Sequence, residues 1–417
     1  MSSALHIAVF VQDFPPEVGA GPARITEMAG AWISEGARVS VVTGIPSRRL
    51  AGQRDGTVPA QYRHRLFVRE QLDKIDVYRS WLYASPRRMF MRTALNNATF
   101  AVTSAWHASR ARLEPDIVIA SGPPYLGLLT AARWATSRRI PLVVELRDLW
   151  PDYLADMKVL PGPLERALFA SERWLLARAA AVSVVTESFK RRVIGKGVPD
   201  EKIGVYPNGV DLGFYRAAPP RSASDTLELG YLGTFGAGQG LTAVVGAARE
   251  ALGAGTRLKL RLVGDGSNRP AVERDAAGEP AIVIGNPIPR AETPAFYASC
   301  DAVLVPHAAL PTLADTVPSK IFEIMACERP VIAALAGEGA SIVRESGAGL
   351  VAKPGDAASI AAAIREFASL PAERRAEMGR AGRRFVETRY DRRSIALRFL
   401  DRLAEVASNG TATSTQR

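Results

Sequence analysis

The chain contains the stretch Leu229-Gly230-Tyr231-Leu232-Gly233-Thr234-Phe235-Gly236-Ala237-Gly238-Gln239-Gly240-Leu241, in which an apolar strand runs into a glycine-rich loop and then a helix. Four of the eight residues from Gly233 to Gly240 are glycine, more than a turn needs. Glycine lets backbone amides approach a ligand closely. The loop therefore predicts a ligand site at the end of a buried strand.

The same alternation of apolar strands and helices is predicted along the chain on both sides of this stretch. Strands are predicted at 6–10, 38–43, 77–81, 116–120, 142–146, 182–186, 203–206, 227–232, 259–263, 281–284, 302–305 and 331–334. Helices are predicted at 23–35, 89–112, 125–137, 164–180, 241–252, 294–299, 319–326, 340–345, 357–368, 372–388 and 392–407. Short β-rich runs that alternate with amphipathic helices indicate an α/β protein with parallel, doubly wound sheets.

The chain has 417 residues, too many for one hydrophobic core. A polar Pro/Ser/Ala stretch at 216–225 is the predicted linker. It divides a first Rossmann-like domain, 1–215, from a second Rossmann-like domain, 226–390. We expect a C-terminal helix at 391–407 that crosses back to the first domain, and a disordered tail at 408–417. In such folds ligands bind at the carboxyl ends of the strands, so a cleft between the two sheets is the expected site.

Composition excludes several classes. The two cysteines rule out a disulfide framework and fit a reducing cytoplasm. No apolar run reaches the ~18 residues that a spanning helix needs, and 4–11 is expected to be a buried strand and not a signal peptide. Net charge is +9 over residues 1–200 and +2 over 201–417, a positive field that attracts phosphate. Solvated arginines on every surface explain the same numbers, and composition leaves both explanations open.

A second glycine loop, with Gly19 and Gly21, follows the first strand. A dinucleotide fingerprint requires glycine at position 24, where this chain has Arg24, and no acidic residue follows the second strand. A nicotinamide dehydrogenase is therefore disfavoured. An anion site at the helix start and a plain tight turn both remain open for this loop. The same two alternatives hold for the strand end that contains Gly264.

The most informative segment is Thr316-Val317-Pro318-Ser319-Lys320-Ile321-Phe322-Glu323-Ile324-Met325-Ala326. Thr316 or Val317 is the predicted helix cap, and Pro318 suits the first turn. The first-turn amides, the Ser319 hydroxyl and the Lys320 ammonium then present donors to a diphosphate. One turn later the Glu323 carboxylate can accept bonds from two ribose hydroxyls. An ordinary capped helix with solvated charges is the alternative.

Together with three further motifs, this segment resembles the GT-B glycosyltransferases of family 4, and most of all the WbuB-like bacterial polysaccharide subgroup. The motifs are Gly238-Gln239-Gly240-Leu241, Arg147-Asp148-Leu149-Trp150-Pro151 and Pro318-Ser319-Lys320-Ile321-Phe322-Glu323. The resemblance runs from His6 to about Ala407. It implies retaining transfer of a sugar from a nucleotide sugar, here expected to be a UDP-sugar, without a metal ion.

The resemblance also assigns residues. In the family's E-x7-E pair, Glu323 is expected to bind the ribose, and Asp315 stands where the family has its first Glu, near the donor sugar. Lys320, with no basic residue in the glycine loop, is expected to neutralise the diphosphate. Arg147 or Asp148 is expected to touch the sugar or acceptor.

Backbone groups complete this set of expected donor contacts. They belong to Gly19, Gly21, Gly236, Gly238, Gly264, Ile288, Pro318 and Ser319. In the family, the loop that ends at Ile288 holds the base.

No metal or other cofactor is expected. The chain has no D-x-D triplet to hold a diphosphate through a cation, and its four histidines show no ligand spacing. Of these histidines only His307, after a predicted strand on the cleft side, is a candidate for a test.

The expected acceptor is lipid-linked or a saccharide. Segment 79–112 mixes basic and aromatic residues and predicts a peripheral contact with the anionic inner face of the cytoplasmic membrane. The alternative for this segment is a core helix with solvated arginines. Two other functions stay open: a sugar-nucleotide epimerase of the same architecture, and a basic nucleic-acid-binding protein. We expect no nucleic acid, since no helix-turn-helix, RRM or zinc pattern is present.

Overall fold

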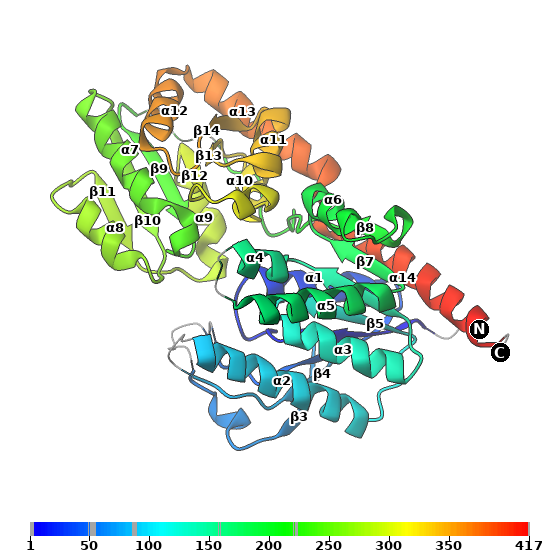
Figure 1. Cartoon of the computed structure of the whole chain (residues 1–417). Helices are drawn as coiled ribbons and strands as arrows, with labels where there is room; N and C mark the ends of the chain where they lie inside the picture. Colours follow the sequence, from blue (N-terminus) through cyan, green and yellow to red (C-terminus); the bar gives the residue numbers. More distant parts are fainter. Residues whose placement is uncertain are drawn as a thin grey trace. The chain divides into compact units, whose positions relative to one another are not determined.

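The computed structural model describes residues 4–48, 50, 56–85, 90–156, 158, 160–219, 221 and 224–415. The chain divides into two compact units, 1–208 with 392–417, and 209–391. Each unit contains one parallel-based sheet covered by helices, so the predicted α/β class is confirmed (Figure 1). The change of unit falls at 208/209, before the predicted linker.

The sheet of the first unit has the order β3-β4-β2-β1-β5-β6-β7-β8. All neighbouring strands are parallel except β3, which is antiparallel to β4. The strands are β1 (His6–Phe10), β2 (Arg38–Gly44), β3 (Phe67–Leu72), β4 (Ile75–Ser80), β5 (Ile117–Gly122), β6 (Leu142–Leu146), β7 (Ala181–Val184) and β8 (Ile203–Val205). The order reverses between β1 and β5, the switch point where such sheets bind ligands.

Helices cover both faces of this sheet. They are α1 (Ala20–Ser34), α2 (Phe90–Arg110), α3 (Tyr125–Ser137), α4 (Trp150–Asp156), α5 (Gly162–Arg178), α6 (Glu187–Gly195) and α14 (Arg392–Thr415), with short 3-10 turns η1 (Ala60–Tyr62) and η2 (Asp200–Lys202). One face carries α2, α3 and α5 side by side (Figure 1). The other face carries α1 and α14.

Helix α14 returns to the first unit and packs on α1. Its buried residues recur at helical spacing: Ile395, Ala396, Phe399, Leu403, Val406 and Ala407. Phe399 stacks on Tyr206 with ring centroids 4.4 Å apart, and the Trp32 indole donates to the Ala396 carbonyl at 2.8 Å. The helix continues to Thr415, whereas the sequence predicts disorder from residue 408. Extending an established helix adds one backbone bond per residue, which is why a polar end can remain helical.

The sheet of the second unit is fully parallel, in the order β11-β10-β9-β12-β13-β14. Its strands are β9 (Leu227–Leu232), β10 (Leu258–Val263), β11 (Ile282–Gly285), β12 (Ala302–Pro306), β13 (Val331–Ala334) and β14 (Gly349–Ala352). Counted within the unit, the order is that of a dinucleotide-binding fold, and it reverses between β9 and β12.

The helices of this unit are α7 (Leu241–Gly253), α8 (Arg269–Ala276), α9 (Thr293–Ala298), α10 (Lys320–Ala326), α11 (Gly337–Ser346), α12 (Ala357–Ser369) and α13 (Ala372–Arg389). Three 3-10 turns accompany them, η3 (Ala237–Gln239), η4 (Arg290–Glu292) and η5 (Pro311–Asp315). One face of the sheet is covered by α7, α8 and α12, and the other by α9, α10, α11 and α13.

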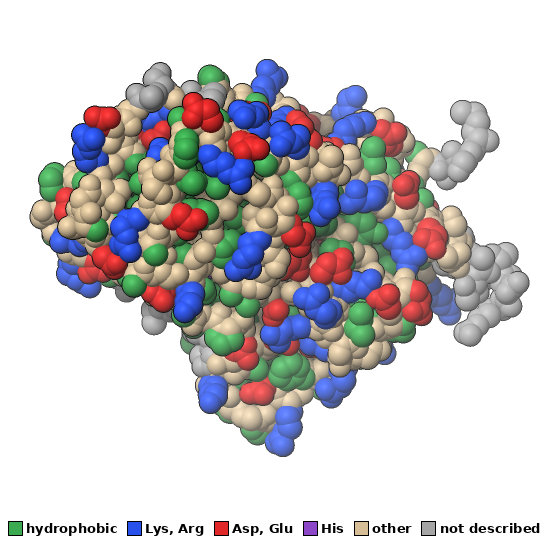
Figure 2. Space-filling view, turned by 90° about the horizontal axis from the view of Figure 1, so that it is seen from above, with side chains coloured by type: hydrophobic (Ala, Val, Ile, Leu, Met, Phe, Trp, Pro, Cys, Tyr) green, Lys and Arg blue, Asp and Glu red, His purple; other side chains and the backbone are tan. Residues whose placement is uncertain are grey.

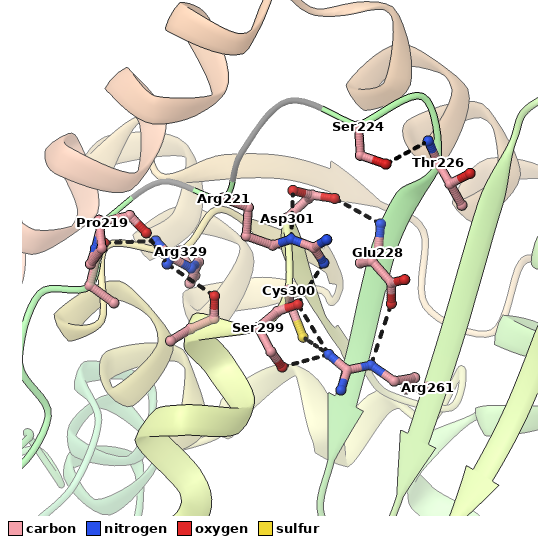
Figure 3. Close-up of polar contacts among 12 residues, drawn as sticks. Pro219, Arg221, Ser224, Thr226, Glu228, Arg261, Ser299, Cys300, Asp301 and Arg329 are labelled. Atoms are coloured by element: carbon pink, nitrogen blue, oxygen red, sulfur yellow. Dashed lines mark hydrogen bonds and ion pairs between the residues drawn. The ribbon is translucent and has the colours of Figure 1, made fainter.

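The described part of the predicted linker is bonded to the second unit (Figure 3). The Arg329 guanidinium donates to the carbonyls of Ala218 and Pro219, at 3.0 and 2.6 Å. Arg221 donates to the Ser299 carbonyl at 2.7 Å and faces Asp301. Polar composition marked this stretch as a spacer, but its carbonyls and guanidinium are satisfied by the domain that follows.

None of the helices in the described ranges combines the length and the apolar character that crossing a bilayer requires.

Candidate functional site

The glycine loop of the second unit lies at the switch point of its sheet, where β9 and β12 end. The Ala308 amide donates to the Gly238 carbonyl at 2.9 Å. At Gly240, φ is +61°, and a Cβ there would lie 2.8 Å from the His307 carbonyl oxygen. The loop after β9 is therefore packed directly on the loop after β12.

Gly264 is explained by backbone packing. Its φ is +153°, and a Cβ would lie 1.8 Å from the Gly233 carbonyl oxygen. The sequence suggests this glycine for donor contact, but the neighbouring strand end already requires it. Its part in the site is to let the loops after β9 and β10 touch.

Gly236 and Gly238 have no such explanation. The φ of Gly236 is −90°, and the nearest atom to a Cβ there is the Thr234 methyl at 3.9 Å. At Gly238 the nearest is a Leu313 methyl at 3.6 Å. A Cβ would fit at both positions, so packing within the described residues does not require glycine at either.

Lys320 is the first residue of α10, and its ammonium lies against this loop. Nζ is 4.3 Å from the centroid of the Tyr231 ring, and a Cβ on Gly233 would lie 2.5 Å from it. Burial lowers the pKa of Lys320 to about 8, with Glu323 acting in the opposite direction. A cation held in such surroundings gains strongly from an arriving anion.

The start of α10 differs by a few residues from the expected cap. Ser319, and not Thr316 or Val317, is the N-cap, and Pro318 precedes it. The Ile321 amide donates to the Pro318 carbonyl at 3.1 Å. Among the described residues the Ser319 hydroxyl caps no helix amide, so it remains available to a ligand.

Glu323 follows Lys320 by one helical turn and lies on the same side of α10. It is half-buried, and one carboxylate oxygen accepts a hydrogen bond from the Tyr297 hydroxyl at 3.1 Å. Tyr297 is fully buried, and burial raises its pKa, with Glu323 adding to the shift. The tyrosine orients the carboxylate, and the Tyr215 hydroxyl makes a further contact with it.

Two other residues that the sequence predicts to contact the nucleotide-sugar donor, Asp315 and Ile288, lie outside this group. Asp315 is half-buried at the end of η5. Ile288 follows β11 and packs partly buried on the hydrophobic cluster that contains Tyr297. The structure thus places Lys320 against the glycine loop, with Glu323 one turn further along the same helix, while Asp315 and Ile288 are flanking residues.

Tyr231 and His307 lie near Lys320. The sequence pattern indicates only His307, as a candidate for a mutational test, and does not identify Tyr231. His307 is buried, and burial together with Lys320 lowers its pKa to about 4. It is therefore a neutral imidazole at neutral pH. For Tyr231, the period-2 pattern of the strand indicates only burial, because its contact with Lys320 spans 89 residues of chain.

In the first unit, Gly21 and Arg147 are brought together at the β1/β5 switch point. A Cβ on Gly21 would lie 2.2 Å from an Arg147 guanidinium nitrogen. The guanidinium also donates to the Gly122 carbonyl at 3.1 Å. Gly19 caps α1 with φ +147°, a value that favours glycine. Asp148, next in the chain, is exposed and belongs to a different small hollow with Tyr125 and Trp150.

Arg24 occupies the position where a dinucleotide fingerprint has glycine, and it forms a fully buried ion pair with Glu145, 3.0 Å apart. It also donates to the carbonyls of Tyr206 and Pro207. Burial alone would raise the pKa of Glu145, but Arg24, Arg147 and the Ser121 hydroxyl together keep it below its usual value. Arg24 thus connects α1 to β6 and to the residues after β8, and sequence spacing gave no signal of this pairing.

Across the described ranges, no three His, Cys, Asp or Glu side chains gather in an arrangement that could hold a metal ion.

Comparison with known proteins identifies both units. A family model described as "Glycosyl transferase 4-like domain" matches residues 19–209, and one described as "Glycosyl transferases group 1" matches residues 226–369. A 2-deoxystreptamine glucosyltransferase from Streptomyces kanamyceticus is 27% identical over 53% of this chain and 59% of its own length. A D-inositol 3-phosphate glycosyltransferase from Kineococcus radiotolerans is 28% identical over 62% and 64%. The alignments thus span about six tenths of the length of these curated relatives.

Among solved structures, HepE from Anabaena in complex with UDP-glucose superposes with a TM-score of 0.69 at 18% identity, over 96% of this chain and 100% of that one. At this identity the likeness establishes the fold. Each family match falls on one of the two Rossmann-like units, and the fold is that of the GT-B glycosyltransferase structures.

Proposed function

We propose that the protein is a retaining, metal-independent glycosyltransferase that moves a sugar from a nucleotide sugar to a lipid-linked or saccharide acceptor. The proposed nucleotide-sugar site rests on one group of residues. Lys320 and Glu323 stand on α10, and a Cβ would fit at Gly236 and Gly238 of the adjacent loop. This group stands at the β9/β12 switch point of a dinucleotide-type sheet.

The diphosphate lies in the space above Gly236 and Gly238, paired with the Lys320 ammonium and the Ser319 hydroxyl. The Glu323 carboxylate accepts bonds from the ribose hydroxyls, and the loop at Ile288 holds the base. Solved relatives of this fold bind UDP and UDP-glucose, which favours a UDP-sugar as donor.

In the reaction the bond between the anomeric carbon and the β-phosphate oxygen breaks, and the acceptor oxygen bonds to the same face of that carbon. The departing diphosphate takes the acceptor's proton, so no side-chain nucleophile is needed. Charge accumulates on the leaving oxygens, where Lys320 and Ser319 are already oriented to stabilise it. A cationic side chain replaces the metal ion that other glycosyltransferases use for this purpose.

The first unit binds the acceptor at its own switch point, with Arg147 beside Gly21 as the contacting cation. Asp148 and Asp315 are proposed to touch the sugar or acceptor. The motif set of the WbuB-like subgroup supports a role in cell-surface polysaccharide or glycoconjugate synthesis.

A calorimetric screen of UDP, GDP, ADP and their sugars against the full chain tests the donor half. We expect one diphosphate to bind in EDTA-containing buffer with micromolar affinity. If none of the diphosphates binds, or if binding requires a divalent cation, the proposal is wrong. Incubation of the bound donor without acceptor checks the epimerase alternative, because an epimerase converts the donor and a transferase leaves its configuration unchanged.

A further inference from the structure

The two adjacent helices α2 and α3 carry no acidic residue. Their 34 residues include Arg92, Arg110 and Arg133 and neither Asp nor Glu. Over the face seen in Figure 2, by contrast, basic and acidic side chains are interspersed. The basic excess of the first 200 residues is therefore concentrated, in part, on one helical layer.

The outer surface of α2 is apolar. Met91 is 74% exposed, Val102 68%, Trp106 53% and Leu95 47%. At 100° per residue these four side chains fall within an arc of about 60°, one continuous stripe along the helix. Contiguous exposed apolar residues beside cations are typical of helices that lie in a membrane interface.

The stripe leads to a hollow of about 610 Å³ between α2, α3 and α5. Its charged lining consists of Arg133, Arg138 and Arg178, beside Trp134 and Trp174, with no carboxylate. Each of the three helices follows a parallel strand and therefore begins near the carboxyl ends of the strands. The hollow is lined by the C-terminal ends of these helices, so it lies near the amino ends of the strands. It is thus a site separate from the β1/β5 switch point.

Two guanidinium groups in the hollow are held in place by indoles. Arg138 lies 4.6 Å from the Trp134 ring centroid, and Arg178 lies 4.4 Å from that of Trp174. Ser109 of α2 accepts from both Arg138 and Trp134, at 3.0 and 3.1 Å, which joins the hollow to the end of the stripe. Arg138 also donates to the Ser137 hydroxyl and Arg178 to the Trp174 carbonyl, and a stacked guanidinium can present its remaining in-plane N–H groups to a phosphate. None of the three arginines makes an ion pair with a described residue.

From this continuity of apolar stripe and arginine hollow, we propose that the α2–α3 layer docks on an anionic bilayer. Met91, Leu95, Val102 and Trp106 enter the interface, and Arg133, Arg138 and Arg178 bind lipid phosphates. This refines the contact predicted for 79–112, of which Arg87 and Arg88 lie outside the described residues. The proposal goes beyond the transfer reaction and does not depend on it.

Co-sedimentation of the full chain with vesicles tests it, using phosphatidylglycerol-containing and pure phosphatidylcholine vesicles. Each basic residue near an anionic surface contributes ~1 kcal/mol, so R133A/R138A/R178A should weaken binding to the anionic vesicles at least tenfold. M91S/V102S should weaken binding to both kinds of vesicle. The matched control R344A/R380A/R384A removes the same charge from exposed positions of the second unit and should bind as the wild type does.

Equal binding by R133A/R138A/R178A and the control overturns the arginine site, and equal binding by M91S/V102S overturns the stripe. Protection of the fold by inorganic phosphate without any vesicle binding shows a soluble-anion site and also overturns the proposal. Calorimetric UDP affinity, measured on every variant, shows whether the second unit is intact. If the wild-type protein does not bind UDP, the proposed function is contradicted. The vesicle-binding result is unaffected, because it does not depend on UDP binding.

Discussion

The Lys320 ammonium lies over the Tyr231 ring, 4.3 Å from its centroid, at the point where a side chain on Gly233 would otherwise project. The cation thus lies under the glycine loop against an aromatic face, and the Glu323 carboxylate on the same helix favours its charged form. An aromatic face attracts a cation without neutralising it. The charge remains available to a diphosphate.

Removing this charge should impair turnover far more than folding. For Lys320→Ala we expect kcat to fall about 10²–10³-fold, the range for loss of one preorganised donor to a developing oxyanion. The melting temperature should change little or rise, because the variant no longer holds a desolvated ammonium. Tyr231→Phe, which keeps the ring, is the control. Turnover of K320A within a few-fold of wild type contradicts the diphosphate assignment.

Donor binding should depend on pH with the pKa of Lys320. Since burial places this pKa at about 8, the residue is protonated below pH 8 and neutral above it. UDP affinity should therefore be level at lower pH and fall as pH rises beyond 8. Calorimetry across pH 6.5–9.5 measures this, and Lys320→Arg should move the decline upward, because a guanidinium stays charged. An unchanged decline in K320R would assign it to another group.

The glycines of the site should separate into two kinds. Gly236→Ala and Gly238→Ala should melt close to wild type but bind UDP at least tenfold more weakly, since the methyl fills ligand space. Gly264→Ala should lose about 2–4 kcal/mol of stability, because its Cβ meets the Gly233 carbonyl. Thermal melting measures the stability of the three variants, and calorimetry measures their affinity for UDP. Normal UDP affinity in G236A and G238A would show that the open space is not the ligand's.

The Glu323 carboxylate should recognise ribose hydroxyls. Hydrogen bonds to charged groups contribute about 1.5–3 kcal/mol, so Glu323→Gln should weaken UDP binding roughly 10- to 100-fold. Tyr297→Phe removes one buried hydrogen-bond donor to the carboxylate and keeps the charge of the carboxylate, so we expect a smaller effect. The readout specific to ribose is 2′,3′-dideoxy-UDP, for which wild type and E323Q should bind alike. A persisting difference with that analogue rules out the ribose contact.

The last helix should be required by the first unit. Phe399 is buried between Trp32 and Tyr206, and Phe399→Ala should cost about 3–5 kcal/mol. Its neighbour Arg398 is exposed, and Arg398→Ala should stay within about 0.5 kcal/mol. Urea unfolding followed by tryptophan fluorescence measures both. Similar stability of the two variants would mean that α14 does not brace this unit.

Hydrophobic pattern alone located the strands that form the middle of each sheet. His6–Phe10, Leu142–Leu146 and Val331–Ala334 are found where they are expected, because fully buried parallel strands are continuous apolar runs. Two edge strands, Phe67–Leu72 and Gly349–Ala352, were not predicted. The first is partly exposed and contains the consecutive polar residues Arg69, Glu70 and Gln71, so its pairing with β4, and not its composition, makes it a strand.

By itself the sequence determined the alternation of strands and helices, the glycine loops and the one-turn spacing from Lys320 to Glu323, since each depends on residues close together in the chain. Only the tertiary structure decided which glycines leave space and which allow backbones to touch. It also decided that Arg24 pairs with Glu145 across 121 residues. These features depend on contacts between distant segments, and a local pattern carries no information about which distant atoms will fill or vacate the space beside it.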